Sequence, residues 1–298
     1  MTNTHKKKVS TRTARIADIL IYAFIAVVSL SCVLPFLHVF SKSISEEAFV
    51  IANKVFLIPK GFSLDAYKKV FSDASIIYSF YISVVVTILF TILGMIITLC
   101  AAYPLSRRGL KGRKVITMFF MFTMYFTGGI IPEYLLMDLL NLLDTLAVMI
   151  LPLAFSPYNL LIMKTSLQNS ISDSLIESAR LDGAGEFTIL SRIVIPLSKP
   201  IIATLSLFYA VGRWNAYQDA LFYIKQNVSL RPLQLKLYYL VVASTESFQT
   251  AVEGAAQLTN PEVLKAACII VATVPIICIY PFIQKYFVKG TMIGAVKE

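Results

Sequence analysis

Residues 74–106 read ASIIYSFYISVVVTILFTILGMIITLCAAYPLS, and this stretch contains no acidic or basic side chain. A helix needs about 20 residues to cross the ~30 Å hydrocarbon core of a bilayer. The stretch exceeds that length and therefore predicts a membrane-spanning helix over about residues 76–105. The solvent of this part of the chain is expected to be lipid.

Five further apolar runs are found by the same search for uncharged stretches. One of them is interrupted, because Arg213 lies near the far end of the run that begins at about Leu197. Residues 1–18 are predicted to form a cytoplasmic tail, and residues 19–298 a single transmembrane domain. The fold class is therefore an all-α polytopic membrane protein with six spans, over about residues 19–41, 76–105, 115–132, 145–163, 197–217 and 266–284.

The composition also favours lipid as the solvent. Of the 298 residues, 57% are hydrophobic and 15% are charged, against roughly 25% charged in an ordinary soluble domain. Intrinsic disorder is excluded, because it requires low hydrophobicity and high net charge. The net charge of +10 has three explanations, namely nucleic acid, an anionic lipid surface or membrane topology.

The placement of the charges decides among these explanations. Residues 107–114 contain five bases and no acid, whereas residues 133–144 contain three acids and no base. Short loops rich in Lys and Arg remain in the cytoplasm. Both termini and a loop over residues 164–199 are then cytoplasmic, and residues 42–73 and 218–265 are external. The excess positive charge reflects topology in the cell membrane, so nucleic acid is not expected as a partner.

Enzymatic motifs are missing from the sequence. It contains no GxxxxGK[ST] loop for a nucleotide phosphate and no GxSxG nucleophile turn. Neither His5 nor His38 has a partner at metal-ligand spacing. We therefore expect no catalytic residue, no metal site and no cofactor on this chain. Acidic residues are absent from the predicted spans, which argues against an ion-coupled transporter.

The cytoplasmic loop contains a short helical pattern, SLIESARLDGA, at residues 174–184. Ser174 and Glu177 have the spacing of a capping box, which predicts that the helix begins at Ser174, and Gly183 is a natural stop. The apolar residues on one shared face are Leu175, Ile176 and Ala179. A helix of about two turns is marginal alone, so we expect it to be held either by a partner or by its own bundle.

This loop resembles the EAA loop of ATP-binding-cassette (ABC) importer permeases. That pattern is Glu-Ala-Ala, three residues, Gly, nine residues and Ile-x-Leu-Pro, and Glu177-Ser178-Ala179, Gly183 and Ile193-Val194-Ile195-Pro196 match its spacing. Ser178 and Ile195 depart from the pattern by small changes. The segment 192–200, Trp214-Asn215 and the ending after Phe287 resemble the sugar-importing branch. The resemblance is closest to the second permease subunit of oligosaccharide importers, of which the maltose permease pair is an example.

The resemblance implies the type I importer permease fold and a mechanism that depends on other chains. Those chains are a second homologous permease in a heterodimer, two copies of a cytoplasmic ATPase that uses ATP and Mg, and an external sugar-binding protein. The residues that the resemblance assigns to ATPase coupling are Glu177, Ser178, Ala179, Arg180, Asp182, Gly183, Ile193 and Pro196. It also implies a second ATPase contact through Gly290, Gly294 and Lys297, with a frayed chain end as the alternative.

Glycine and proline add expectations about the backbone. Gly183 is expected to turn the chain at positive φ. Pro196 and Pro200 are expected to break the chain direction at the start of the fifth span. Pro152 and Pro157 predict kinks in the fourth span.

The residues that could contact a sugar are less specific. Sugars are bound by aromatic faces, amides and hydroxyls, and the candidates in the predicted spans are Tyr125, Tyr158, Asn159, Trp214 and Asn215. For aromatic residues near span ends the alternative is the interfacial aromatic belt. Asn159 is expected to face protein or a water-filled path, because an unpaired amide is costly in lipid. Arg213 is expected to extend to the outer surface, with an ion pair near the pathway as the alternative.

The sequence thus predicts a non-catalytic permease subunit of an ATP-driven, binding-protein-dependent oligosaccharide importer. A permease for a non-sugar solute, such as an amino acid, peptide or ion, remains open, and a secondary transporter is a further alternative. The external segment 218–265 is long for a loop without function. By resemblance it reaches into the binding protein, and an amphipathic hairpin packed on the outer face is the alternative.

Overall fold

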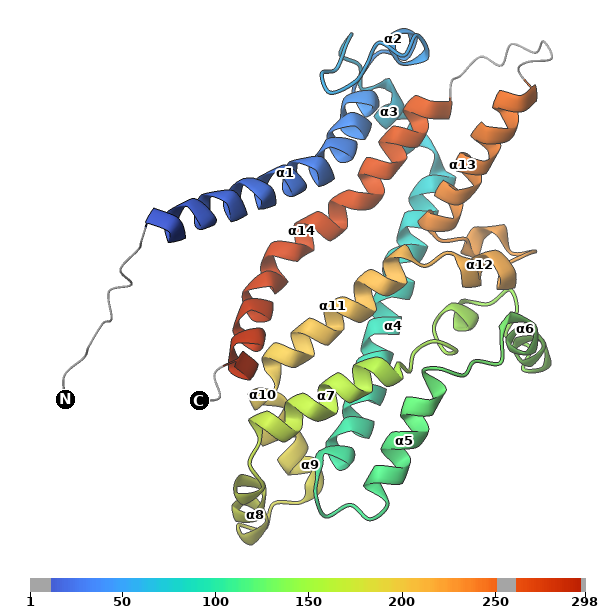
Figure 1. Ribbon diagram of the computed structural model, residues 1–298. Coiled ribbons are helices and arrows are strands. Elements are labelled where there is room, and N and C mark those ends of the chain that lie inside the picture. Colours follow the sequence, from blue (N-terminus) through green and yellow to red (C-terminus); the bar gives the residue numbers. More distant parts are fainter. Residues whose placement is uncertain (1–11, 251–260, 296–298) are drawn as a thin grey trace. The chain divides into compact units, whose positions relative to one another are not determined.

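The structure is a computed structural model that describes residues 12–250 and 261–295 of the chain (Figure 1). Within these residues the regular structure is helical, and the only β feature is an isolated antiparallel bridge between Ser45 and Phe62. The prediction of an all-α fold is therefore confirmed.

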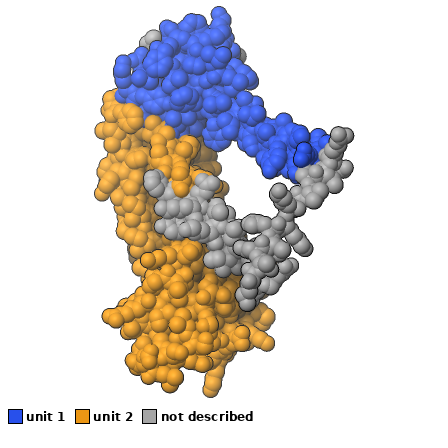
Figure 2. Space-filling model, turned by 90° about the vertical axis from the view of Figure 1, so that its left-hand side faces the viewer, with its two compact units in different colours: residues 1–70, 253–270 blue, residues 71–252, 271–298 orange. Residues whose placement is uncertain are grey.

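The chain divides into two compact units (Figure 2). The first comprises residues 1–70 and 253–270, and the second comprises residues 71–252 and 271–298. Each unit has buried apolar residues of its own, such as Val50 and Val70 in the first and Leu160 and Leu205 in the second.

The first unit contains one long helix and two short ones. They are α1 (Arg12–Ser43), α2 (Glu47–Ile51) and α3 (Asp65–Ser72), the last of which continues into the second unit. The first predicted span lies within α1, and no residue in the most apolar part of this helix is buried. The surface of α1 is therefore available to lipid or to other chains.

The second unit is built around α4 (Ala74–Ser106), which contains the second predicted span. Asp73 caps this helix, because its side chain accepts hydrogen bonds from the backbone N–H groups of Ser75 and Ile76. Two helices, α7 (Pro157–Ser170) and α11 (Lys199–Asn215), pack along α4 more extensively than any other pair of described elements.

Gly94, within α4, determines how closely the neighbouring elements approach. A Cβ atom at this position would lie 2.9 Å from the carbonyl oxygen of Ala154 and 2.9 Å from the ring of Tyr209. Both distances are shorter than van der Waals contact. A larger residue would therefore push α11 or the segment before α7 away from α4.

The remaining elements are short, apart from α13 and α14. In chain order they are α5 (Arg113–Thr123), α6 (Ile130–Leu139), the 3-10 turn η1 (Leu146–Met149), α8 (Asp173–Leu181), α9 (Glu186–Ile189), the π-helical turn η2 (Leu190–Val194), α10 (Ile195–Leu197), α12 (Gln218–Tyr223), the 3-10 turn η3 (Val228–Leu230), α13 (Leu233–Thr250) and α14 (Pro261–Ala295). The first residues of α14 belong to the first unit.

Three of the described helices are long and apolar enough to cross a membrane, namely α1, α4 and the Glu262–Pro281 part of α14. A fourth span results if the helices Glu186–Leu197 and Lys199–Asn215, which meet at 82°, are counted together. The expected fifth helix therefore follows a sharp change of direction, with Pro196 and Pro200 each in a first helical turn, as predicted.

The predicted spans 115–132 and 145–163 are not single helices in the structure. Residues 124–129 separate α5 from α6, and Gly129 has a φ of +83° there. Residues 150–156 separate η1 from α7. Pro157 begins α7 and does not kink a longer helix, which corrects the prediction. The reason is that proline is tolerated in the first turn and costly in a helix interior.

Two buried apolar clusters lie toward opposite ends of α4. One joins the last turns of α4 to α7, α8, α9 and α11, and it includes Tyr103, Leu160 and Ile176. The other joins the first half of α4 to η1, α12 and α13, and it includes Ile82 and Tyr223. The helix α8, which contains four of the eight residues assigned to ATPase coupling, is thereby fixed to the end of the bundle.

Candidate coupling site and transport path

The N-cap of α8 lies two residues earlier than the capping-box spacing predicts. Ser172, and not Ser174, is the N-cap, because the backbone N–H of Leu175 donates to the Ser172 hydroxyl at 3.3 Å. The Ser174 hydroxyl donates to the same Ser172 oxygen at 3.1 Å. This cap places Asp173 in the first turn, where a negative charge is favourable next to the positive end of the helix dipole.

Gly183 ends α8 as predicted. It has a φ of +81°, and its backbone N–H donates to the carbonyl of Arg180 at 3.0 Å, while Ala184 N–H donates to the carbonyl of Ala179 at 2.9 Å. These two bonds form a Schellman motif, which satisfies the last carbonyl groups of the helix. A Cβ atom on Gly183 would meet no atom within 4 Å, so the backbone angle alone makes glycine the fitting residue.

The predicted coupling residues divide between two faces of α8. Of the predicted coupling residues in α8, Ala179 is buried in the core of the bundle at 9% exposed, beside Ile176 at 2%. The side chain of Ala179 is therefore not part of the surface that is open to a partner. The coupling residues on that open surface are Glu177, Ser178, Arg180, Asp182 and Gly183.

Two apolar residues on this surface were missed from the sequence. Leu181 is 89% exposed and Phe187 is 81% exposed, one on each side of the Gly183 turn. The sequence carried a signal for Leu181, because at 100° per residue it lies away from the apolar face that Leu175, Ile176 and Ala179 share. Leu181 and Phe187 are thus two large apolar side chains that are exposed close to the polar coupling residues.

The later coupling residues lie in the segment that leads to α11. Ile193 lies in η2 and packs against the core cluster around α8. Pro196 is exposed at the start of α10. Gly290 and Gly294 lie within α14, which remains helical to Ala295, whereas Lys297 lies outside the described residues.

The five candidate residues for the sugar path do not form one cluster of contacts. Tyr125 follows α5 and is 78% exposed, and Tyr158 is 56% exposed in the first turn of α7. Asn159 is buried, in agreement with its expected position facing protein. Trp214 is buried and donates from Nε1 to the carbonyl oxygen of Ala272 at 3.0 Å.

Asn215, the last of the five candidates, is the final residue of α11, and its side chain bonds back to the helix. Its side-chain amide donates to the carbonyl oxygen of Val211 at 2.9 Å, and the residue is exposed. Trp214 also makes an edge contact with the Phe80 ring, whose centroid is 5.7 Å away. Trp214 therefore joins α4, α11 and α14, and this packing role differs from an aromatic belt.

Arg213 does not extend to the outer surface, which corrects the prediction. Its guanidinium Nη1 and Nη2 donate to the two carboxylate oxygens of Asp219 at 2.5 and 3.0 Å. The two side chains are 2% and 8% exposed. The guanidinium also lies 5.6 Å from the centroid of the Phe90 ring. The pair thus holds the end of α11 to the start of α12. The ion pair that the sequence left open as an alternative is therefore present.

A second polar contact in the interior lies beside Gly94. The Tyr209 hydroxyl lies 2.7 Å from Thr98 Oγ1 and accepts the backbone N–H of Ser156 at 3.2 Å. Tyr209 is buried and its ring meets the edge of Phe90 at 5.8 Å. The segment that precedes α7 is therefore tied to α11 across α4.

Charged and aromatic side chains gather at the end of the second unit that contains α12. Lys225 Nζ lies 4.7 Å from the centroid of the Tyr134 ring, and Arg231 lies 5.2 Å from that of Tyr239. Asp144 accepts the backbone N–H groups of Asn227 at 3.0 Å and of Gln226 at 2.8 Å. These bonds hold the pKa of Asp144 below its ordinary value, and the bond from Asn227 contributes most.

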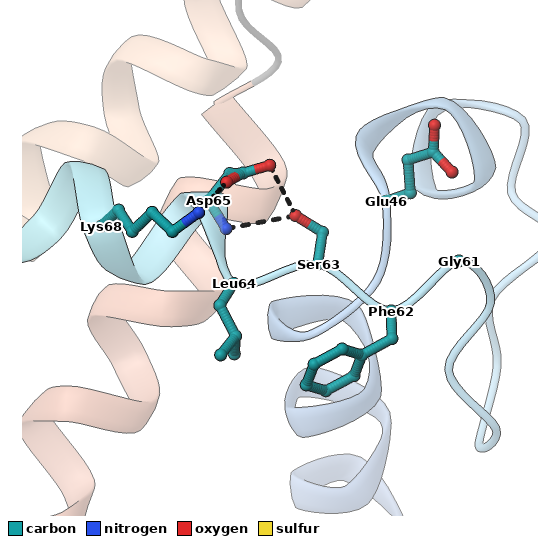
Figure 3. Close-up of a pocket in the computed structure, with 7 residues that line it drawn as sticks. All are labelled: Glu46, Gly61, Phe62, Ser63, Leu64, Asp65 and Lys68. Atoms are coloured by element: carbon teal, nitrogen blue, oxygen red, sulfur yellow. Dashed lines mark hydrogen bonds and ion pairs between the residues drawn. The ribbon is translucent and has the colours of Figure 1, made fainter.

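A pocket of about 540 Å³ lies in the first unit (Figure 3). Its lining residues are Glu46, Gly61, Phe62, Ser63, Leu64, Asp65 and Lys68. The Asp65 carboxylate accepts hydrogen bonds from Lys68 Nζ and Ser63 Oγ, each at 2.9 Å. Its charge is thus already matched within the pocket. No group of His, Cys, Asp and Glu that could hold a metal ion occurs among the residues that the structure describes.

The fold and the α8 site define a class of protein: a polytopic membrane permease that presents a short, fixed helix at one end of its bundle. The sequence profile of the family described as "Binding-protein-dependent transport system inner membrane component" matches residues 114–293. This match covers more than half of the chain, and the protein belongs to that family.

Relatives with known names extend this result over more than nine tenths of the chain. The chain is 44% identical over 284 residues to the polygalacturonan/rhamnogalacturonan transport system permease protein YtcP of Bacillus subtilis (strain 168). The match covers 95% of this chain and 99% of the relative. It is 28% identical over 276 residues to the melibiose/raffinose/stachyose import permease protein MelC of the same strain, covering 91% and 94%.

A solved structure agrees in fold. A chain from a bacterial ABC transporter involved in the import of the acidic polysaccharide alginate superposes with a TM-score of 0.83 at 33% identity, covering 93% of this chain and 98% of that one. The resemblance inferred from the EAA pattern is confirmed. The protein is a non-catalytic permease subunit of an ABC importer in the cell membrane, and it works with a second permease, an ATPase and a binding protein.

Proposed function

We propose that this permease imports oligosaccharides as one half of a heterodimeric membrane pathway. The relatives described above are named for the transport of glycans, which favours a sugar over an amino acid, peptide or ion. Two copies of the ATPase bind ATP and Mg, and this chain binds no cofactor. An external binding protein delivers the sugar.

The observation that carries the coupling role is the exposed surface around Gly183. A short helix that is buried on one side and open on the other suits a joint with an ATPase cleft. Leu181 and Phe187 supply apolar contact area at 89% and 81% exposed, and a few well-packed anchor residues supply most of the affinity at protein interfaces. Glu177, Arg180 and Asp182 surround them, and peripheral charges contribute more to specificity than to affinity. Gly290 and Gly294 of α14, with Lys297, form the second ATPase contact.

The pathway is formed by six spans, with both termini in the cytoplasm. The third span combines α5 and α6, and the fourth combines η1 and α7, each with a non-helical break. Such breaks are tolerated at membrane depth where the backbone faces protein or a water-filled cavity. Tyr125 lies in the first break, and Tyr158 and Asn159 directly follow the second. This position supports their role in the sugar path, together with Trp214 and Asn215.

The sugar itself is acidic in this proposal. One relative is named for polygalacturonan and rhamnogalacturonan, and the solved structure belongs to an importer of an acidic polysaccharide. Lys225 and Arg231 each lie beside a tyrosine ring. They provide cations and aromatic faces at the end of the second unit that contains α12, in the segment predicted to be external. A uronic acid offers the matching carboxylate and the apolar C–H face.

The coupling role is tested by purifying the tagged permease with its ATPase. Phe187→Ser should weaken recovery of the ATPase roughly tenfold, because truncating an interface anchor costs about 1–2 kcal/mol or more. Phe62→Ser is the matched control, since Phe62 is 73% exposed in the predicted external segment. Gly183→Asp should still insert in the membrane and should stop transport. Equal recovery with Phe187→Ser and Phe62→Ser would contradict the proposal.

The substrate class is tested by uptake of labelled trigalacturonate and labelled maltotriose into cells that express the transporter. Uptake of trigalacturonate that falls in a Lys225→Ala, Arg231→Ala variant supports the acidic class. Uptake of maltotriose alone would be consistent with a sugar importer and would contradict the proposal that the sugar is acidic. Binding of amino acids or ions, and of no glycan, by the cognate binding protein would overturn the sugar assignment.

A further inference from the structure

Both ends of α8 are tied to the end of α4 by side-chain contacts. One tie starts at Asp173, in the first turn of α8, and the other starts at Arg180, in its last turn. The partner residues on the side of α4 are Tyr103, Arg107 and Arg108. The coupling residues predicted from the sequence do not include any of these partners.

The first tie is an ion pair at the surface. The Asp173 carboxylate lies 3.7 Å from Arg107 Nη1 and 3.4 Å from Arg108 Nε. Arg108 is 87% exposed, whereas Arg107 is 12% exposed and lies 5.4 Å from the centroid of the Tyr103 ring. The Arg108 side of this tie is exposed and therefore weak, whereas Arg107 is largely buried, so the tie holds the first turn of α8 mainly through Arg107.

The second tie passes through Glu186, which is the first residue of α9. Its Oε1 accepts Nε and Nη2 of Arg180 at 3.0 and 2.6 Å, and its Oε2 accepts the hydroxyl of Tyr103 at 2.8 Å. Tyr103 is 7% exposed, in the last turn of α4. Both oxygens of one carboxylate are therefore used, and bonds to a charged acceptor are about twice as strong as neutral ones.

Apolar packing closes the space between the two ties. Ile176 and Ala179 of α8 lie in the same buried cluster as Tyr103 and Leu105 of α4. A close-packed interior transmits displacement instead of absorbing it. A tilt of α8 must therefore move the end of α4 or break a bond to Glu186. That bond is either the one from Arg180, where the two side chains are 52% and 58% exposed, or the one from the buried Tyr103.

The other end of this connection is the centre of the second unit. α4 packs along α7 and α11, and the Thr98 and Tyr209 hydroxyls join α4 to α11 at 2.7 Å. Thr98 lies five positions before Tyr103 in the same helix. Movement at Tyr103 thus has a short, continuous route to the helices that flank the proposed sugar path.

We propose that Tyr103 and Glu186 are positioning residues that transmit the movement of α8 to α4. This inference rests on the proposed coupling of α8 to the ATPase. Tyr103→Phe removes only the hydroxyl and keeps the ring in the core. Glu186→Ala removes the acceptor for both partners. Tyr81→Phe is the matched control, because it deletes the same atom on the same helix, from a ring that is 58% exposed.

The test uses the whole transporter reconstituted in proteoliposomes. Sugar uptake and ATP hydrolysis are measured together, with labelled trigalacturonate or maltotriose, whichever the wild type carries. Tyr103→Phe and Glu186→Ala should each retain the ATPase and its hydrolysis and lower the sugar moved per ATP by roughly fivefold or more. The double variant should be no worse than the poorer single variant, because both act on one bond. Tyr81→Phe should match the wild type.

A second measurement is independent of the substrate and of ATP hydrolysis. Spin labels at Ser178 on α8 and Lys111 after α4, in a chain whose four cysteines are replaced by serine, report the distance between the two elements. The distribution should broaden in Tyr103→Phe and stay unchanged in Tyr81→Phe. An unchanged distribution, or an unchanged ratio of sugar to ATP, overturns the inference. A wild type that recruits no ATPase would instead overturn the proposed function, and the spin labels would still test the link.

Discussion

Replacement of Asp219 by asparagine should destabilise the protein strongly, because it leaves the Arg213 guanidinium buried without a counter-charge. The two nitrogen–oxygen distances of 2.5 and 3.0 Å describe a bidentate pair, and the side chains are only 2% and 8% exposed. The Phe90 ring, 5.6 Å from the guanidinium, covers a further side. Water therefore has little access to replace the lost carboxylate.

The magnitude follows from this burial. Removing one partner of a buried ion pair costs about 3–5 kcal/mol, and a chain of this size loses roughly 2 °C of melting temperature per kcal/mol. Asp219→Asn should thus lower the melting temperature by about 6–10 °C. Replacing both residues, as Arg213→Met with Asp219→Leu, should recover most of the loss, because no charge then remains buried.

The assay is thermal unfolding of the purified permease in lipid nanodiscs, followed by the fraction that remains monodisperse. Asp65→Asn is the control, because Asp65 and Lys68 form a pair of 2.9 Å that is exposed on both sides, and such pairs add little stability. The reasoning is refuted if Asp219→Asn melts with the wild type, or if the double variant is no more stable than the single one.

Three further predictions concern the core, the cap of α8 and pH. Gly94→Val should cost about 1–3 kcal/mol, because even a Cβ would lie 2.9 Å from an aromatic ring, and the same melting assay checks this. Ser172→Ala should destabilise α8 by about 1 kcal/mol and lower sugar uptake, whereas Ser174→Ala should leave uptake unchanged. The pKa of Asp144 is lower in the folded protein than in the unfolded chain. The charged carboxylate therefore stabilises the fold at a pH above its pKa in the unfolded chain. That stabilisation is lost as the pH falls through its pKa in the folded protein. Asp144→Asn should therefore melt with a weaker pH dependence than the wild type as the pH falls below about 5. Larger loss with Ser174→Ala than with Ser172→Ala, or an unchanged pH dependence, would contradict these expectations.

The long uncharged helices could be predicted from the sequence because a single rule decides them. A run without charge that exceeds the bilayer thickness has few alternatives, and α4 over Ala74–Ser106 contains the predicted 76–105. The same rule takes no account of where the backbone conformation interrupts a helix. It therefore predicted one helix over 115–132, where Gly129 at a φ of +83° divides α5 from α6. It also joined residues on both sides of Pro157.

Local rules decided less at the coupling site. Ser172 and Ser174 both fit a helix start, and only the structure shows that Ser172 receives the N–H of Leu175. The partner of Arg213 could not be found from periodicity, because Asp219 lies beyond the end of α11, after the chain has turned into α12. Gly183 could be predicted, since positive φ at a helix end is a property of one residue and its two hydrogen bonds.

The two alternatives for α8, a docking helix or a connector on its own bundle, describe its two faces and do not exclude each other. Ile176 and Ala179 face inward into the core, and Leu181 and the nearby Phe187 face outward. A helix that contacted only a partner could receive movement but could not pass it on. A helix that contacted only its bundle would have nothing to receive. The exposed apolar residues and the inward contacts, in the core and through Glu186 to Tyr103, are therefore both required if a nine-residue helix is to connect an ATPase to the transmembrane helices.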